Sequence, residues 1–248
     1  SAMKKTLSLI LTLVLLFTTL PIAFAQEAQA APKYVFMFIG DGMGGPQISA
    51  TQYYLGTIQN PGAALPTPAP LSFTGFENVG LMTTYDATSF CPDSASTSTS
   101  MASGQKTLSG VINYDVNLET PFKLITEYAK EAGKKVGVVS SVSLDHATPA
   151  AYYAKEKSRK NYYDIAVQAL TGETLDFLGG GQFLDFDGEG RQNLLDLAAE
   201  NGFAIADSNE AIRALDEQSG RTLAMVPDPD PDKAMQFEID RQRGKAEG

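Results

Sequence analysis

Short apolar runs alternate with amphipathic segments through the second half of this sequence, and that alternation constrains the fold more than any other feature. Four runs have the length and composition of buried strands: residues 135–143, 176–181, 203–208 and 222–227. Four segments have helical spacing: residues 121–133, 158–170, 191–202 and 209–220. Strands that alternate with helices predict an α/β fold, with a mostly parallel central sheet covered by helices on both faces.

Two further strand candidates precede this region. Residues 34–39 are wholly apolar and end at Gly40, which is typical of a buried central strand followed by a sharp turn. Residues 79–85 form the second candidate, and residues 60–70 between them predict a proline-rich surface loop.

The first 30 residues are typical of a secretory signal peptide, after a cloning remnant at residues 1–2. Two lysines precede the apolar run 7–20, and small residues offer cleavage after Ala25 or Ala30. The alternative is an uncleaved membrane anchor, for which this run is short because a spanning helix needs about 20 apolar residues. We therefore predict an exported protein, periplasmic or extracellular, with no stable membrane insertion after cleavage.

Composition narrows the possible partners and chemistry. The formal net charge is -10 and no basic run occurs, which argues against nucleic acid as a partner. A single cysteine, Cys91, excludes an intrachain disulfide, and His146 is the only histidine. Residues 227–248 alternate proline with acid and then become highly charged, which predicts a flexible end with a charged tail at 242–248.

Asp41 follows the apolar run 34–39 and lies between two glycines. Ligands of open parallel sheets bind at the carboxyl ends of strands, so this carboxylate suits a divalent cation. A turn aspartate that accepts a hydrogen bond from its own backbone explains the same pattern.

The serine-rich stretch 89–107 predicts a helix with Asp93 or Ser94 at its N-terminus, because its small residues recur at helical spacing. A helix N-terminus favours phosphate, and a serine there can serve as a nucleophile. A structural N-cap is the alternative, and a flexible linker is a third interpretation.

A second group of polar residues follows the strand 135–143. Asp145, His146 and Thr148 can contribute to a metal site, and Arg159 can bind two phosphate oxygens through its planar fork. The ordinary alternatives are a structural histidine and a surface arginine.

Taken together, these motifs resemble those of the alkaline phosphatases, which are metal-dependent phosphomonoesterases. "FMFIGDGMG" is similar to that family's first strand and metal-binding aspartate, "PDSASTSTSMASGQKT" to its nucleophile segment, and "HATPAAY" with "SRKNYY" to its magnesium segment and phosphate-binding arginine. The resemblance extends from about Lys33 to Arg241. It implies that residues 31–241 are the N-terminal part of the catalytic domain, in an alkaline-phosphatase-like sandwich that is incomplete at its C-terminus.

The resemblance also implies roles for individual residues. Ser94 would attack phosphorus and form a phosphoserine, and Arg159, oriented by Asp93, would hold two phosphate oxygens. The complete enzyme would use two zinc ions and one magnesium ion.

For the metals, the resemblance implies that Asp41 bridges a zinc and the magnesium, that zinc holds the Ser94 alkoxide, and that Thr148 ligates magnesium. His146 occupies a position where family members carry aspartate or histidine.

One departure from the family pattern is large. The family completes its metal sites with three histidines, further aspartates and a glutamate, whereas His146 is the only histidine of this sequence. We therefore expect a chain that carries the N-terminal half of a phosphomonoester-hydrolysing site. The resemblance also implies a homodimer when the protein is full length.

Two other interpretations stay open. The first is a phosphodiesterase, nucleotide pyrophosphatase or sulfatase of the same superfamily; sulfatases use a modified cysteine, and Cys91 lies three residues before Ser94. The second is an inactive or phosphate-binding fragment.

Overall fold

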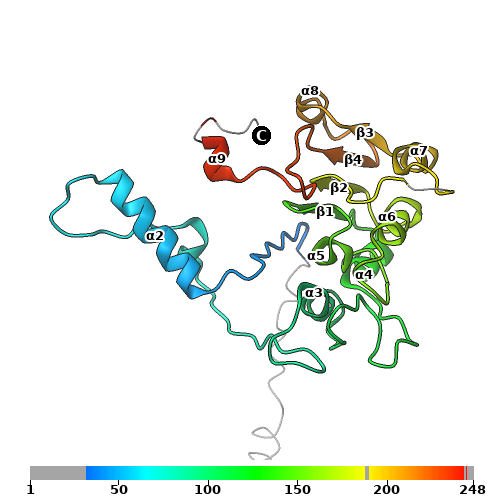
Figure 1. Ribbon diagram of the computed structural model, residues 1–248, viewed down its shortest axis with the longest axis horizontal. Helices are drawn as coiled ribbons and strands as arrows, with labels where there is room; N and C mark the ends of the chain where they lie inside the picture. The colour runs from blue at the N-terminus through cyan, green and yellow to red at the C-terminus, as the bar shows by residue number, and fades with distance from the viewer. Residues whose placement is uncertain (1–31, 188–189, 243, 245–248) are drawn as a thin grey trace, which may run out of the picture. The chain divides into compact units, whose positions relative to one another are not determined.

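The computed structural model describes residues 32–187, 190–242 and 244 (Figure 1). The chain divides into two compact units, one that ends at Leu71 and one from Ser72 to Gly248. The predicted signal peptide at residues 1–30 and most of the tail at 242–248 lie outside the described residues. Within the part of the chain that is described, no helix is both long and apolar enough to cross a membrane.

From residue 121 onward, the predicted strands and helices occur in the predicted order, and the structure adds two short helices at 147–150 and 238–242. In chain order the helices and strands are α2 (Gly45–Gln59), the 3-10 helix η1 (Ser72–Gly75), α3 (Ser94–Ser103), α4 (Ile125–Glu131), β1 (Gly137–Ser140), α5 (Ala147–Ala150), α6 (Tyr162–Thr171), β2 (Phe177–Gly180), α7 (Leu194–Glu200), β3 (Ala204–Ala206), α8 (Asn209–Arg213), β4 (Thr222–Met225) and α9 (Glu238–Gln242).

The first unit contains α2 and the loop at 60–70, which folds back along the helix. Pro46 stands in the first turn of α2, where its missing N–H costs nothing. The N–H of Ala69 donates to the carbonyl of Gln52 at 2.9 Å, and Gly56 is buried beneath the loop. A Cβ at Gly56 would lie 1.9 Å from the carbonyl oxygen of Thr67, so only glycine allows this close approach.

The second unit is built on a parallel sheet with the strand order β1-β2-β4-β3. In its register Val138, Leu178 and Leu223 lie side by side in one row. These three side chains are buried and belong to the same hydrophobic cluster as Ile165 of α6 and Leu194 of α7. The parallel sheet with its helices confirms the predicted α/β fold.

On the opposite face of the sheet the side chains are mostly small. Gly179, Ala224 and Ala206 form the row next to the buried one, because successive residues of a strand point to opposite faces. This row ends at Val139 on the edge strand β1, where the side chain is 71% exposed.

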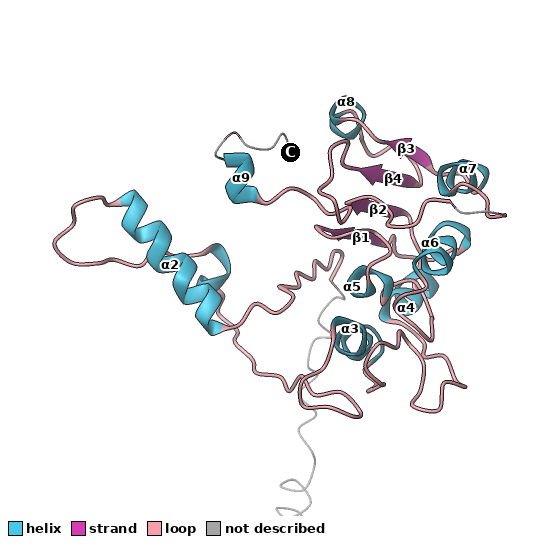
Figure 2. Cartoon of the chain, viewed as in Figure 1, coloured by secondary structure: helices cyan, strands magenta, loops and turns pink. Residues whose placement is uncertain are grey.

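The two strand predictions in the first 90 residues are wrong for this structure. Residues 34–39 and 79–85 have no strand assignment, and Figure 2 draws both as loop. Their side chains are largely exposed, among them Phe38 at 92% and Leu81 at 102%. A strand exists through hydrogen bonds to a neighbouring strand, and an apolar run predicts burial without naming that neighbour.

The prediction of a flexible end is also wrong for part of the tail. The carbonyl of Lys233 accepts from the N–H of Gln182 at 2.8 Å, and the N–H of Met235 donates to the carbonyl of Ser141 at 2.8 Å. These bonds attach the tail to the backbone that follows β2 and β1. The alternation of proline and aspartate predicts that the side chains of this segment are solvated. It does not reveal hydrogen bonds between its backbone and segments that are distant in sequence.

Candidate active site

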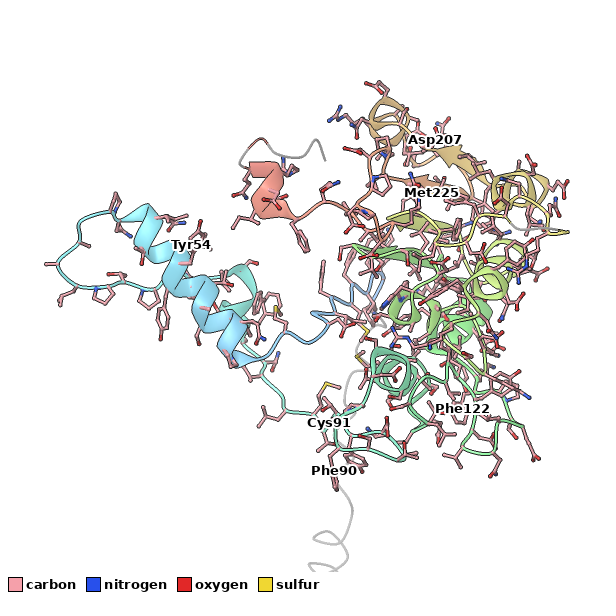
Figure 3. All side chains as sticks on the ribbon, in the orientation of Figure 1. Tyr54, Phe90, Cys91, Phe122, Asp207 and Met225 are labelled. Atoms are coloured by element: carbon pink, nitrogen blue, oxygen red, sulfur yellow. The ribbon has the colours of Figure 1, made fainter. Side chains whose placement is uncertain are left out.

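The serine-rich stretch forms the helix α3, so the linker interpretation is wrong. Asp93 is its N-cap, with extended backbone and a side chain that accepts from the N–H of Ser96 at 3.0 Å. Ser94 is therefore the first residue of the helix and is half-buried. Figure 3 shows Phe90 and Cys91 on the loop that leads into α3, so the helix begins at the serine and not at the cysteine.

The Asp93 carboxylate does more than cap the helix. One oxygen accepts from the N–H and, at 2.9 Å, from the hydroxyl of Ser96. The other accepts from the N–H of Gly110 at 3.0 Å and from Nη1 of Arg159 at 2.9 Å. Burial works to raise the pKa of Asp93, but these hydrogen bonds outweigh it and hold the pKa below its ordinary value. The carboxylate is thus ionised at neutral pH.

Arg159 lies just before α6 and connects the two predicted groups of residues. Its Nη1 pairs with Asp93, and its Nη2 lies 3.1 Å from Nε2 of His146. Because a guanidinium can only donate, Nε2 of His146 accepts in this arrangement and its lone pair is engaged. These contacts use two of the five N–H groups of Arg159, which leaves donors for two oxygens of an anion.

The segment that carries His146 follows the carboxyl end of β1. His146 is the N-cap residue of α5, and Thr148 is half-buried within that short helix. The hydroxyl of Ser98 on α3 donates to the carbonyl of Ala147 at 3.3 Å, and small residues let these two helices approach closely. The structure therefore packs the middle of α3 against the start of α5.

The side chain of Asp145 has a different partner from that of its neighbour His146. Its side chain is buried and accepts from the N–H of Leu184 at 2.8 Å, in the loop after β2. Burial raises the pKa of Asp145 to about 6, against hydrogen bonds that lower it. This carboxylate supports the loop after β2, and a metal site shared by Asp145, His146 and Thr148 stays a prediction.

Asp41 belongs to the first unit. It lies in a tight turn that is closed by a hydrogen bond from the N–H of Met43 to the carbonyl of Gly40 at 3.1 Å, with Gly42 at a φ of 68°. The turn matches the sharp turn that the sequence predicts after residue 39. The role of Asp41 as a metal ligand stays a prediction.

The described residues bring together too few metal-binding side chains for zinc. Among the described residues, no group of three or more histidine, cysteine, aspartate and glutamate side chains is placed to hold a metal ion. Zinc sites take three or four protein ligands. The described residues therefore do not fit a zinc centre by themselves.

Three residues of this site were missed from the sequence: Ser96, Gly110 and Asp86, whose carboxylate accepts from the hydroxyl of Ser96 at 3.2 Å. Gly110 holds both partners of the ion pair, since its N–H donates to Asp93 and its carbonyl accepts from the N–H of Arg159 at 2.8 Å. A signal for Asp86 was present, because aspartate two or three residues before threonine and serine favours a turn capped by its side chain.

Comparisons with known proteins identify alkaline phosphatases as relatives of this chain. The family model "Alkaline phosphatase" matches residues 32–179 of this chain. Alkaline phosphatase 3 of Bacillus subtilis (strain 168) is 33% identical over 223 residues, which cover 85% of this chain and 46% of the relative. Alkaline phosphatase 4 of the same organism is 32% identical over 202 residues, which cover 78% of this chain and 42% of the relative. The chain thus spans less than half the length of these curated relatives.

Solved structures of similar fold agree. A cold-active alkaline phosphatase from the psychrophile Shewanella sp. matches with a TM-score of 0.67 and 27% identity, over 82% of this chain and 47% of that chain. A variant of TAB5 alkaline phosphatase, with a histidine replaced by glutamate and magnesium bound in its M3 site, matches with a TM-score of 0.60 and 28% identity, over 79% of this chain and 54% of that chain.

Proposed function

Since this chain belongs to the alkaline phosphatase family, we propose that Asp93, Ser94 and Arg159 form the phosphate-binding and nucleophilic part of a site for hydrolysis of phosphate monoesters. The observation that carries the proposal is the ion pair between Asp93 and Arg159, which joins the start of α3 to a residue 66 positions later. A carboxylate that orients an arginine beside a helix N-terminus provides a receptor for a doubly charged phosphate group.

Phosphate binding follows from the charges in this arrangement. Asp93 neutralises part of the Arg159 charge but occupies only Nη1, and His146 accepts from Nη2. The remaining N–H groups of Arg159 can donate to two phosphate oxygens in a planar, bidentate contact. The N-terminus of α3 adds a partial positive charge on the side of Ser94.

The reaction that we propose has two displacements. The Ser94 hydroxyl oxygen loses its proton and forms a bond to phosphorus while the bond from phosphorus to the ester oxygen breaks, and the departing alcohol gains one proton, which balances the proton that the serine lost. Water then attacks the phosphoserine, which releases inorganic phosphate and restores the serine. Arg159 holds the phosphate through both displacements and stabilises the charge that develops on its oxygens.

Metals are part of the proposal for the complete enzyme only. The family implies two zinc ions and one magnesium ion. The magnesium ion bound in the TAB5 variant supports the magnesium part of this proposal. Asp41, Ser94 and Thr148 are candidate ligands on this chain, and His146 is a fourth once its Nε2 is released from Arg159. Because the described residues do not fit a zinc centre, no catalytic step is assigned to zinc here.

A second candidate function is phosphate binding without turnover. The absence of a three-residue metal cluster from the described part of the chain favours it, since a serine without a metal or a base is a weak nucleophile. The phosphodiesterase and sulfatase alternatives lack such an observation. Arg159 favours monoesters over both, because a bidentate arginine matches a terminal dianionic phosphate.

The proposal includes an exported, periplasmic or extracellular protein that is a homodimer when full length. Both expectations follow from the N-terminal sequence and from the family, and cleavage and mass measurements on secreted protein test them.

The test of the proposed function is hydrolysis of p-nitrophenyl phosphate at alkaline pH with zinc and magnesium supplied. Activity that Ser94→Ala removes and that Ser98→Ala keeps supports the phosphomonoesterase. Phosphate binding that Arg159→Ala abolishes, without any hydrolysis, supports the binding function. Equal hydrolysis of bis-p-nitrophenyl phosphate or of p-nitrophenyl sulfate would contradict the monoester assignment.

A further inference from the structure

A second carboxylate lies behind Asp93, and the proposed reaction does not use it. Asp86 is 4% exposed, although it lies in a loop outside every helix and strand. One of its oxygens accepts from the N–H groups of Thr88 at 2.8 Å and Ser89 at 2.6 Å. A carboxylate is this deeply buried only when donors compensate its charge, so these contacts fix the loop at 86–89.

The other oxygen of Asp86 reaches out of its own loop. It accepts from the hydroxyl of Ser109 at 2.5 Å and from the hydroxyl of Ser96 at 3.2 Å. Ser96 stands in the first turn of α3, and Ser109 directly precedes Gly110. Asp86 thus connects the two backbone segments whose N–H groups bind the Asp93 carboxylate.

Those two segments determine where Arg159 lies. Asp93 is held by Ser96 on one oxygen and by Gly110 on the other, and Gly110 also accepts from the N–H of Arg159. A change in the distance between α3 and the turn at 109–110 therefore changes the position of the guanidinium. The Ser96 hydroxyl has one proton, which the two carboxylates share: its oxygen lies 3.2 Å from Asp86 and 2.9 Å from Asp93.

We propose that Asp86 is a positioning residue for phosphate binding, which acts by holding Ser96 and Ser109 and, through them, the Asp93–Arg159 pair. This inference rests on the proposed function, because it gives Arg159 the phosphate. Asp86 itself makes no contact with the phosphate. Its effect is on the geometry of the arginine, and misplacement of a binding group by a fraction of its hydrogen-bond length is costly to affinity.

The experiment measures the dissociation constant of inorganic phosphate by titration calorimetry on the 248-residue chain. Asp86→Ala removes both links, and we expect it to weaken phosphate binding by about tenfold, which corresponds to about 1.4 kcal/mol. Asp86→Asn keeps the shape, because its amide nitrogen can donate to both hydroxyls, and we expect it to retain most of the affinity. Asp115→Ala is the control, since Asp115 also accepts from two backbone N–H groups of a loop, and these donors, Glu119 and Thr120, belong to neither segment that binds Asp93.

A double-mutant cycle separates positioning from general destabilisation. If Asp86 acts through Arg159, then Asp86→Ala adds no further loss of affinity in an Arg159→Lys background. The same tenfold loss in that background, or wild-type affinity in Asp86→Ala itself, would overturn the inference. Unchanged phosphate binding in Arg159→Lys and in Arg159→Ala would instead refute the proposed function, and the inference with it.

A further measurement needs no phosphate. Hydrogen exchange at the N–H groups of Ser96 and Gly110 reports how firmly Asp93 is held. We expect faster exchange at both in Asp86→Ala and in the milder variant Ser109→Ala, and no change in Asp115→Ala. Wild-type protection in both of the first two variants would overturn the inference even if no variant binds phosphate measurably.

Discussion

The substitution Asp93→Asn tests the geometry of the site directly, because an amide cannot replace this carboxylate. Both oxygens of Asp93 accept: one from Ser96 and the other from Gly110 and Arg159. Asparagine offers one oxygen and one NH₂ group. In either orientation of the amide, its NH₂ group faces N–H donors, either that of Ser96 or those of Gly110 and Arg159.

The magnitude follows from which bonds are lost. If the NH₂ group faces Gly110 and Arg159, the charged hydrogen bond is lost at a cost of about 1.5–3 kcal/mol. If it faces Ser96, the cap of α3 is lost at a cost of about 1 kcal/mol, and the charge on Arg159 is no longer balanced. The Asp93 side chain is 27% exposed, and solvent screens part of the charge effect. We expect the free energy of unfolding to fall by about 2 kcal/mol.

The assay is urea unfolding at pH 7, with Asp115→Asn as the control. The two backbone donors of Asp115 share its Oδ1, so the carbonyl oxygen of asparagine can keep both bonds. The control should therefore unfold within about 0.5 kcal/mol of the wild-type chain. Equal losses in the two variants, or no loss in Asp93→Asn, would refute the argument from donors and acceptors.

Three further predictions concern the fold and the pH dependence. Phe183 is fully buried and contacts the ring of Phe186 edge-on at 5.7 Å between centroids, so Phe183→Ala should lower the free energy of unfolding by about 3–5 kcal/mol in urea titrations, and Phe183→Leu by clearly less. Gly110→Ala should cost about 1–2 kcal/mol because its φ is 80°, although there is room for the added methyl group; a melting temperature equal to that of the wild-type chain would count against it. Burial raises the pKa of Asp86, but hydrogen bonds from Ser109, Thr88 and Ser89 outweigh it and lower the pKa from 3.8 to about 2. The folded chain therefore keeps this stabilisation above pH 4 and loses it as the pH falls toward 2, so the stability difference between wild type and Asp86→Ala should shrink between pH 5 and pH 2 in denaturation measured across that range.

The sequence predicts a strand correctly where the segment that pairs with it is also an apolar run. β1, β2, β3 and β4 are apolar runs that pair with one another, so a pattern that predicts each strand also predicts the sheet. Residues 34–39 have an equally strong pattern, yet they form no ladder. Hydrophobic periodicity measures the tendency of a segment to be buried, and pairing depends on a second segment that the pattern does not identify.

The candidate site shows the same limit at the level of single residues. From the sequence, Asp93 or Ser94 could be either a helix cap or a functional residue. In the structure the carboxylate of Asp93 both caps α3 and binds Arg159. Neither contact excludes the other, because the two oxygens face different segments. That Asp86 lies beneath this pair could not be predicted, since its partners are 10 and 23 residues away and are ordinary serines.

The strand order β1-β2-β4-β3 has a consequence for the way the chain assembles during synthesis. Translation produces β3 before β4, but among the described strands β3 pairs only with β4, and β4 enters between β2 and β3. Until residue 225 has left the ribosome, β3 lacks its partner β4, and β2 presents an open edge on the side that β4 will occupy. β4 therefore joins the two sides of this sheet, and a chain that has not yet reached it has an exposed strand edge that can pair with other molecules.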